Sequence, residues 1–393
     1  MNSRNSIRCC LARALVLAGG ALTLSFTGAV NTVWAAKPLK PPPPPPATST
    51  IYFTIPEDPN TTVEIWKMNP DGSGKTRVLD LLRVGDIGDD EGFIPSKAKH
   101  GDRRWFLLLR NAGGTYPNIS GDYVFLRREL FAISDRGEVV QLTDDKSFQP
   151  NDHVMGGAML CWTIGPDGAD SRITLVGRRW NAEGTAITEV GLFAIDINPE
   201  TLAGNSGENL GLSPVRLPIP LSITYDDESY GDAALVRGYD WSPDGTRVVY
   251  SDGGILFIVG PDGVSPQVLV SDAVPNAHHP VWSPVLVGGQ PQILFTTGTG
   301  GWQITLERIN LDGTGRITVV PPFTNDRIFR YPQSTLWSPT GDYVVFAEYD
   351  SGFGVPWKKA QCDIISVTSS GSSRRSLTGD NAGWCYPRGW TLP

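Results

Sequence analysis

The sequence has few of the residues on which most metal sites and hydrolases depend. Its 393 residues contain only four His and five Cys. The Gly-x-Ser-x-Gly nucleophile elbow, the His-Glu-x-x-His and Cys-x-x-Cys metal spacings and the phosphate-binding Gly-rich loop are all absent. The sequence therefore offers no recognisable catalytic motif, and we expect a protein that binds rather than catalyses.

Charged residues are also scarce. Asp, Glu, Lys and Arg make up 19% of the chain, the net charge is −8 at pH 7, and no basic run follows the N-terminal region. Such a chain is a poor candidate for binding nucleic acid or an anionic membrane surface. Gly (44) and Pro (32) are abundant and separate many short apolar runs. This pattern predicts strands joined by turns rather than helices.

The N-terminal region has the pattern of a targeting leader followed by a linker. Three Arg lie in its first 13 residues, an apolar stretch covers 14–30, and residues 33–36 offer a small-residue cleavage site. We expect a signal peptide over 1–36, a proline-rich linker over 37–50 and the folded domain over 51–393. An uncleaved membrane anchor is the alternative, although Gly, Ser and Thr interrupt the apolar stretch. The mature chain is expected to be periplasmic or secreted, monomeric and without a membrane span.

The rest of the chain repeats a short pattern. Its clearest form is Trp-Ser-Pro, which occurs at 241–243, 282–284 and 337–339 and is followed each time by a β-rich run. A third apolar run then leads to a tight turn, often Asp-Gly, in which Gly supplies the positive φ. Weaker copies occur earlier in the chain. Six units of four strands predict an all-β fold, a six-bladed β-propeller with four-stranded antiparallel blades.

The two ends of the repeat region are predicted to share one blade. The first unit starts at its second strand, over 51–55, and residues 386–393 match the start of a first strand. The C-terminal strand would then complete the N-terminal blade and leave no open sheet edge. In this register Cys362 and Cys385 fall at the same end of neighbouring blades, so we expect them to form a disulfide. Cys161 is expected to be a buried free thiol.

The Trp-Ser-Pro-Asp-Gly phrase at 241–245, with the strand that follows it, resembles the repeats of TolB-like propellers. The resemblance is clearest over 239–347. It implies a propeller that acts as a protein-binding scaffold in the cell envelope, as in the Tol–Pal system. TolB carries an α/β domain before its propeller, and here only the proline-rich linker takes that place. The repeat also occurs in propellers attached to peptidases and in an oligogalacturonate lyase family, so it specifies the fold more than the function.

Long loops and blade-to-blade crossovers share one face of such a propeller, and binding usually concentrates on long loops. We expect aromatic and Arg side chains on this face to recognise an envelope protein, a peptide or a carbohydrate. The alternative for each Trp is packing between blades, because Trp is highly buried on average. The candidate binding residues are Trp180, Arg237, Trp302, Arg330, Tyr331, Trp357 and Trp384.

A second hypothesis is a metal-assisted lyase of acidic sugars. His278 and His279, together with His153 and a carboxylate such as Glu91, could supply ligands for a divalent metal. Arg237 or Arg330 would neutralise the sugar carboxylate. A His before the Trp-Ser-Pro phrase is also a common feature of these repeats, and the leading hypothesis is a non-catalytic scaffold without a cofactor.

Overall fold

The computed structural model describes most of the chain from residue 48 onward. The described residues are 48–58, 62–82, 94–115, 126–150, 160–165, 168–220, 238–271, 277–298, 304–322, 327–328, 335–350, 361–379, 381–382 and 385–393. None of the helices in these ranges is long and apolar enough to span a bilayer. The predicted leader and most of the predicted linker lie outside them.

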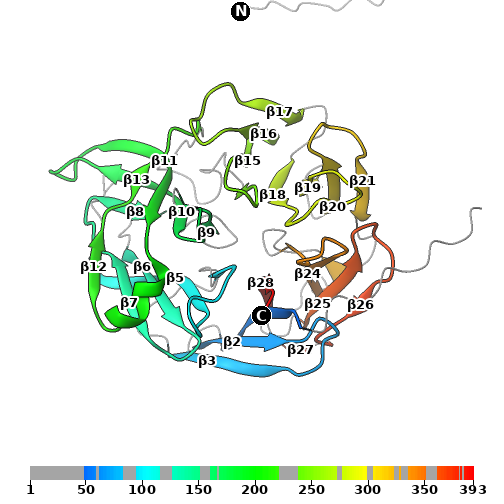
Figure 1. Ribbon diagram of the computed structural model, residues 1–393, viewed down its shortest axis with the longest axis horizontal. Coiled ribbons are helices and arrows are strands. Elements are labelled where there is room, and N and C mark those ends of the chain that lie inside the picture. The colour runs from blue at the N-terminus through cyan, green and yellow to red at the C-terminus, as the bar shows by residue number, and fades with distance from the viewer. Residues whose placement is uncertain are drawn as a thin grey trace, which may run out of the picture. The chain divides into compact units, whose positions relative to one another are not determined.

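Six small sheets form a ring, which confirms the prediction of a six-bladed all-β propeller (Figure 1). Each blade is mainly an antiparallel sheet. Blade 1 consists of β28 (Tyr386–Thr391), β1 (Thr50–Asp58), β2 (Thr62–Met68) and β3 (Thr76–Leu82). Blade 2 consists of β4 (Ile94–Pro95), β5 (Trp105–Thr115), β6 (Leu126–Ser134) and β7 (Val139–Thr143). Blade 3 consists of β8 (Phe148–Pro150), β9 (Leu160–Thr163), β10 (Arg172–Trp180), β11 (Ile187–Asp196) and β13 (Val215–Arg216).

The second half of the ring has the same construction. Blade 4 consists of β14 (Tyr239–Trp241), β15 (Val248–Asp252), β16 (Ile255–Val259) and β17 (Gln267–Val270). Blade 5 consists of β18 (His278–Trp282), β19 (Gln292–Gly298), β20 (Ile304–Asn310) and β21 (Ile317–Val320). Blade 6 consists of β22 (Arg327–Ile328), β23 (Leu336–Trp337), β24 (Tyr343–Asp350), β25 (Gln361–Thr368), β26 (Arg375–Ser376) and β27 (Asn381–Ala382).

The Trp-Ser-Pro phrase forms the end of an innermost strand and the turn after it. In blade 4, Trp241 closes β14 and is 2% exposed. The Ser242 hydroxyl accepts a hydrogen bond from the Arg247 amide at 2.9 Å and donates one to Asp244 at 2.5 Å. Gly245 completes the turn at φ +70°. The phrase therefore buries a large side chain between blades and fixes a tight turn at the end of the channel.

An insertion in blade 3 extends blade 2. The chain after β11 forms the short helix α1 (Pro199–Leu202), a 3₁₀ turn at Ala203–Asn205 and the strand β12 (Asn209–Leu212). Strand β12 pairs in parallel with β7 and adds a fifth strand to the outer edge of blade 2. The described part of the insertion thus contributes to the sheet structure.

The C-terminal strand lies within the first blade. Strand β28 pairs antiparallel with β1, with Trp390 opposite Ile51. The predicted disulfide joins Cys362 of β25 to Cys385, which precedes β28, with their Cα atoms 5.7 Å apart. Cys161 is a free thiol, but it is partly rather than fully buried. The disulfide therefore links blade 6 directly to the strand that completes blade 1.

Candidate functional site: the central channel

The channel at the centre of the ring contains a cavity of about 590 Å³. The innermost strands of all six blades contribute side chains to it, and so do the turns that follow the Trp-Ser-Pro phrases. Cavities of this size with mainly apolar walls and a few placed polar groups are typical of ligand sites. The register of the repeats decides which side chains reach the lumen.

One layer of side chains comes from the residue immediately before the repeat Trp. Successive residues of a strand point to opposite sides, so when the Trp packs between blades its neighbour faces the lumen. All six neighbours line the cavity, and we call them the inner ring. In blade order the inner ring is Gly389, Ile94, Cys161, Asp240, Val281 and Leu336.

Blade 1 supplies no side chain to the inner ring because of the residue that faces it. Pro95 of blade 2 stands where other blades carry Trp, and it packs against the backbone of Gly389. A Cβ atom at Gly389 would lie 2.1 Å from Pro95 Cγ. Only glycine permits this approach of blades 1 and 2.

A second layer comes from the residue two positions after each repeat Trp, or after Pro95 in blade 2. We call it the mouth ring. Five of its six members line the cavity, the exception being Ile164. Lys97 is its one charged member. In blade order the mouth ring is Leu392, Lys97, Ile164, Pro243, Pro284 and Pro339.

Asp240 is the acidic group of the inner ring. Its carboxylate accepts hydrogen bonds from the backbone amides of Trp241 at 2.8 Å and Trp282 at 2.7 Å. The Cys161 thiol lies 3.6 Å from the same carboxylate. Burial raises the pKa of Asp240 above its usual range, while the positive charge of Lys97 and the hydrogen bonds act in the opposite direction. Asp240 therefore connects three neighbouring blades and places a carboxylate in the channel wall.

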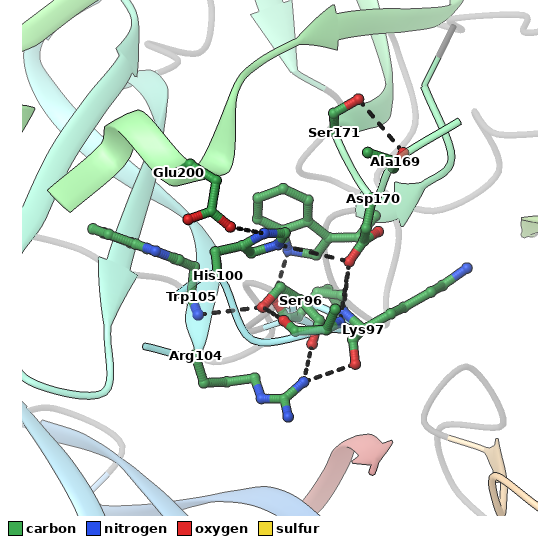
Figure 2. Close-up of polar contacts among 12 residues, drawn as sticks. Ser96, Lys97, His100, Arg104, Trp105, Ala169, Asp170, Ser171 and Glu200 are labelled. Carbon is green, nitrogen blue, oxygen red and sulfur yellow. Dashed lines mark hydrogen bonds and ion pairs between the residues drawn. The ribbon is translucent and has the colours of Figure 1, made fainter. Parts of the chain in front are cut away.

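Lys97 sits on a turn that the surrounding residues hold firmly (Figure 2). The Asp170 carboxylate accepts hydrogen bonds from the Lys97 amide at 2.9 Å and from the Ala98 amide at 3.3 Å. The buried Arg104 guanidinium donates to the carbonyls of Ser96 at 2.6 Å and Lys97 at 2.8 Å. Figure 2 shows the Lys97 side chain extending away from this cluster. The turn is therefore fixed while the amine projects from it.

The charge of Lys97 is stabilised by its acidic neighbours. The side chain has accessible surface inside the lumen, yet protein groups surround it closely enough that burial acts to lower its pKa. The nearby groups of Cys161, Asp240 and Asp170 outweigh burial, so the pKa of Lys97 is raised. Burial raises the pKa of the Cys161 thiol to about 12. At neutral pH Lys97 is therefore an ammonium and Cys161 a neutral thiol.

His100 lies next to the turn that carries Lys97, between the side chains of Asp170 and Glu200. Its Nε2 lies 4.0 Å from Asp170 and its Nδ1 lies 3.7 Å from Glu200. Burial lowers the pKa of His100, although both carboxylates act against this. Figure 2 shows the imidazole between the two acidic side chains. His100, Asp170 and Glu200 therefore pack against the turn that carries Lys97, and none of the three lines the cavity.

Apart from the disulfide residues, the structure describes three of the predicted binding and metal-site residues. Trp180 is 4% exposed, ends β10 and lies 3.3 Å from the Gln149 side chain through its indole nitrogen, so it packs within blade 3 instead of lying open on a loop. His279 lines the cavity, and His278 Nδ1 lies 3.2 Å from the Ser251 hydroxyl. The others fall outside the described residues, namely Arg237, Trp302, Arg330, Tyr331, Trp357, Trp384 and His153.

The predicted metal site cannot be assembled from the described residues alone. The rings of His278 and His279 have their centroids 6.2 Å apart. Within the described ranges no three His, Cys, Asp or Glu side chains come close enough together to hold a metal ion. His153 and Glu91, the other proposed ligands, lie outside those ranges.

Sequence reasoning missed two central residues of the channel, Lys97 and Asp240. Asp240 could have been found from its place directly before a Trp-Ser-Pro phrase, because that position faces the lumen in each blade. Lys97 was harder to find because blade 2 reads Pro95-Ser96-Lys97, without the Trp. The remaining signal is Ser96, whose hydroxyl accepts from the Trp105 amide as Ser283 accepts from Gln292.

Comparison with known proteins adds structural likenesses of low similarity. No family model matches the sequence, and no curated protein gives a significant match. A putative TolB from Agrobacterium tumefaciens is 16% identical with a TM-score of 0.45, over 86% of this chain and 98% of that one. TolB from Acinetobacter baumannii is 12% identical with a TM-score of 0.49, over 86% of this chain and 66% of that one.

An oligogalacturonate lyase in complex with manganese is similar to a lesser degree. It is 10% identical with a TM-score of 0.37, over 80% of this chain and 70% of that one. Because all three TM-scores lie below 0.5, these likenesses carry no argument about what this chain binds. The assignment of the fold rests on the strand pairing described above.

Proposed function

We propose that this chain is a non-catalytic binding propeller of the TolB-like type that receives a segment of a partner protein or peptide in its central channel. The observation that carries the proposal is the lining of the 590 Å³ cavity, in which apolar and Pro side chains surround three charged residues, Lys97, Asp240 and Arg388. Apolar walls with a few oriented polar groups provide affinity and specificity together. Export is part of the proposal, with 1–36 as leader and 37–50 as linker.

The rigidity of the lining also supports binding. Asp240 is held by two backbone amides, and the Lys97 turn is held by Asp170 and Arg104. A site that is already ordered loses less entropy when a partner binds.

The proposal is tested by filling the channel. Val281→Trp puts a large side chain into the inner ring, and Val268→Trp, on the outer strand β17 where Val268 is 57% exposed, is the matched control. Each immobilised variant and the wild type are incubated with envelope extract, and the partners captured by the wild type are identified and titrated. We expect Val281→Trp to weaken binding at least about tenfold, or about 1.4 kcal/mol, and Val268→Trp to leave it unchanged.

Near-ultraviolet circular dichroism and the unfolding midpoint show whether each variant is folded. Equal affinity of the wild type and a folded Val281→Trp for every captured partner would exclude the channel as the binding site. The search would then move to the loop-rich face, starting with Trp302 and Trp357.

A further inference from the structure

We infer that the mouth ring contains a carboxylate subsite in which the Lys97 ammonium binds a carboxylate of a peptide partner. The inference rests on the proposed function and specifies the chemistry of the segment that enters the channel. The carboxylate could belong to the C-terminus of the partner or to an Asp or Glu side chain, and the experiment below separates these two sources.

The composition of the mouth ring is the first argument. The equivalent positions of the other five blades carry Leu392, Ile164 and three Pro. The Lys97 ammonium is the one charged group among these apolar side chains, and the Lys97 side chain has accessible surface in the lumen. Lys97 therefore marks the point of the ring where a polar group of a ligand would be received.

The hydrogen bonds of the neighbourhood are the second argument. Asp240 already accepts from two backbone amides and faces the Cys161 thiol. No hydrogen bond, and no ion pair within 4.0 Å, joins the Lys97 ammonium to any of the residues that the structure describes, although its backbone is fully engaged. The lumen thus holds a cation with free donors beside an anion whose acceptors are largely used.

The local charge balance favours a carboxylate over a phosphate. Asp240 and Asp170 both lie near Lys97, and the chain as a whole carries a net charge of −8. Phosphate groups carry close to two negative charges and are usually bound by several cations or an Arg fork. These two acidic groups repel a doubly charged phosphate more strongly than a singly charged carboxylate, and the surrounding Pro and Leu side chains match the apolar residues that flank a carboxylate in a peptide.

The turn that carries Lys97 is held on both sides. The Asp170 carboxylate accepts from its backbone amides and Arg104 donates to its carbonyls, while the Lys97 side chain projects from it. Preorganised cations bind anions with a smaller loss of entropy than mobile ones. This arrangement distinguishes Lys97 from Lys99, which lies on the same turn but lines a separate hollow of about 300 Å³.

The experiment uses three tripeptides as probes. They are acetyl-Ala-Pro-Leu with a free C-terminal carboxylate, the same peptide amidated, and amidated acetyl-Ala-Glu-Leu. Each is titrated into the full protein and into Lys97→Met, Lys97→Arg and Lys99→Met by calorimetry. We expect at least one carboxylate probe to bind the wild type and Lys99→Met about tenfold tighter than the neutral amide. This preference disappears in Lys97→Met and is retained in Lys97→Arg.

The two carboxylate probes identify the source. Tighter binding of the free C-terminus points to a chain end, and tighter binding of the Glu peptide points to an acidic side chain. The inference is overturned if the neutral amide binds as tightly as both carboxylate probes, if Lys97→Met keeps the preference, or if no probe binds at millimolar concentration. A Lys97→Met that only lowers the unfolding midpoint, with the preference intact, assigns Lys97 a structural role.

Failure of this inference is distinguishable from failure of the proposed function. If charged and neutral probes bind equally and Val281→Trp abolishes both, the channel still binds peptides and only the carboxylate preference is wrong. If Val281→Trp affects neither the probes nor the captured partners, the channel is not the site.

Discussion

Two aspartates four residues apart show how strongly position in the repeat determines chemistry. Asp240 precedes the Trp-Ser-Pro phrase and faces the lumen, where burial raises its pKa. Asp244 follows the phrase on the turn between β14 and β15, where the hydrogen bond from the Ser242 hydroxyl lowers its pKa. The same side chain thus serves the channel in one position and the turn in the other. A motif that is strong for fold can therefore hide a functional residue next to a structural one.

The free thiol offers a prediction at this scale. Because burial raises the pKa of Cys161 to about 12, its thiolate fraction at pH 8 is very small. We expect alkylation by iodoacetamide at pH 8 to be about a thousandfold slower in the folded protein than in guanidinium, since the thiolate is the nucleophile. The measurement follows the peptide that contains Cys161 by mass spectrometry. Comparable rates in the folded and unfolded protein would show that the thiol is not desolvated.

The sequence predicted the roles of some residues and missed those of others. The pairing of Cys362 with Cys385 followed from the strand register and is confirmed. Trp180 was a candidate for the open face, but a Trp that ends a strand can fill the blade interior as well as line a loop, and sequence alone does not distinguish the two. Lys97 was missed because its repeat lacks the Trp that makes the others visible.

At the scale of elements, the repeats predicted the blades because the Trp, the turn after it and the following apolar run all indicate the same strand positions. The Trp, the Ser turn and the following β-rich run recur in blades 4, 5 and 6, and all three form the predicted strands. Blade 2 has Pro95 in place of the Trp, and its innermost strand β4 has only two residues. The strand β12, in the insertion after β11, adds to blade 2 through long-range pairing that no local pattern indicates.

The turns of the repeats make the fold sensitive to acid. Asp244 accepts hydrogen bonds from Ser242 and Thr246, and its lowered pKa means that the folded state favours the carboxylate. This stabilisation is fully present above the usual Asp pKa of about 4 and is lost as pH falls below it. We expect Asp244→Asn to lower the unfolding midpoint at pH 7, with a difference from wild type that shrinks toward pH 3.

A matched variant repeats this test in another blade. Asp312 accepts from the Thr314 amide at 2.9 Å and from its hydroxyl at 2.6 Å, and these bonds lower its pKa. Asp312→Asn should show the same dependence on pH. A difference from wild type that stays constant between pH 7 and pH 3 would mean that charge on the turn is irrelevant and that only the hydrogen-bond geometry matters.

At the scale of the whole molecule, the C-terminal segment that contains β28 contacts blades 1, 2 and 6. It pairs with β1 along one edge, and the preceding Cys385 is bonded to Cys362 of blade 6. On the other side, the buried Arg104 of blade 2 donates to the Leu392 carbonyl at 2.7 Å. The C-terminal strand is therefore held by three blades. This strand contributes Gly389 to the channel and the residue that follows it contributes Leu392, so the integrity of the ring and the shape of the site are coupled.

Opening the disulfide tests this coupling. The bond closes a segment with a sequence separation of 23, and its reduction should lower the free energy of unfolding by about 3 kcal/mol through the entropy of the unfolded chain. Oxidised and reduced wild type are unfolded in urea, with mass spectrometry confirming reduction, and Cys161→Ala serves as the control that retains the bond. A reductant should lower the midpoint of the wild type and of Cys161→Ala but leave that of the double variant Cys362→Ala/Cys385→Ala unchanged. If reduction leaves the wild-type midpoint where it was, the strand pairing of β28 and the Arg104 contact suffice to hold the ring closed.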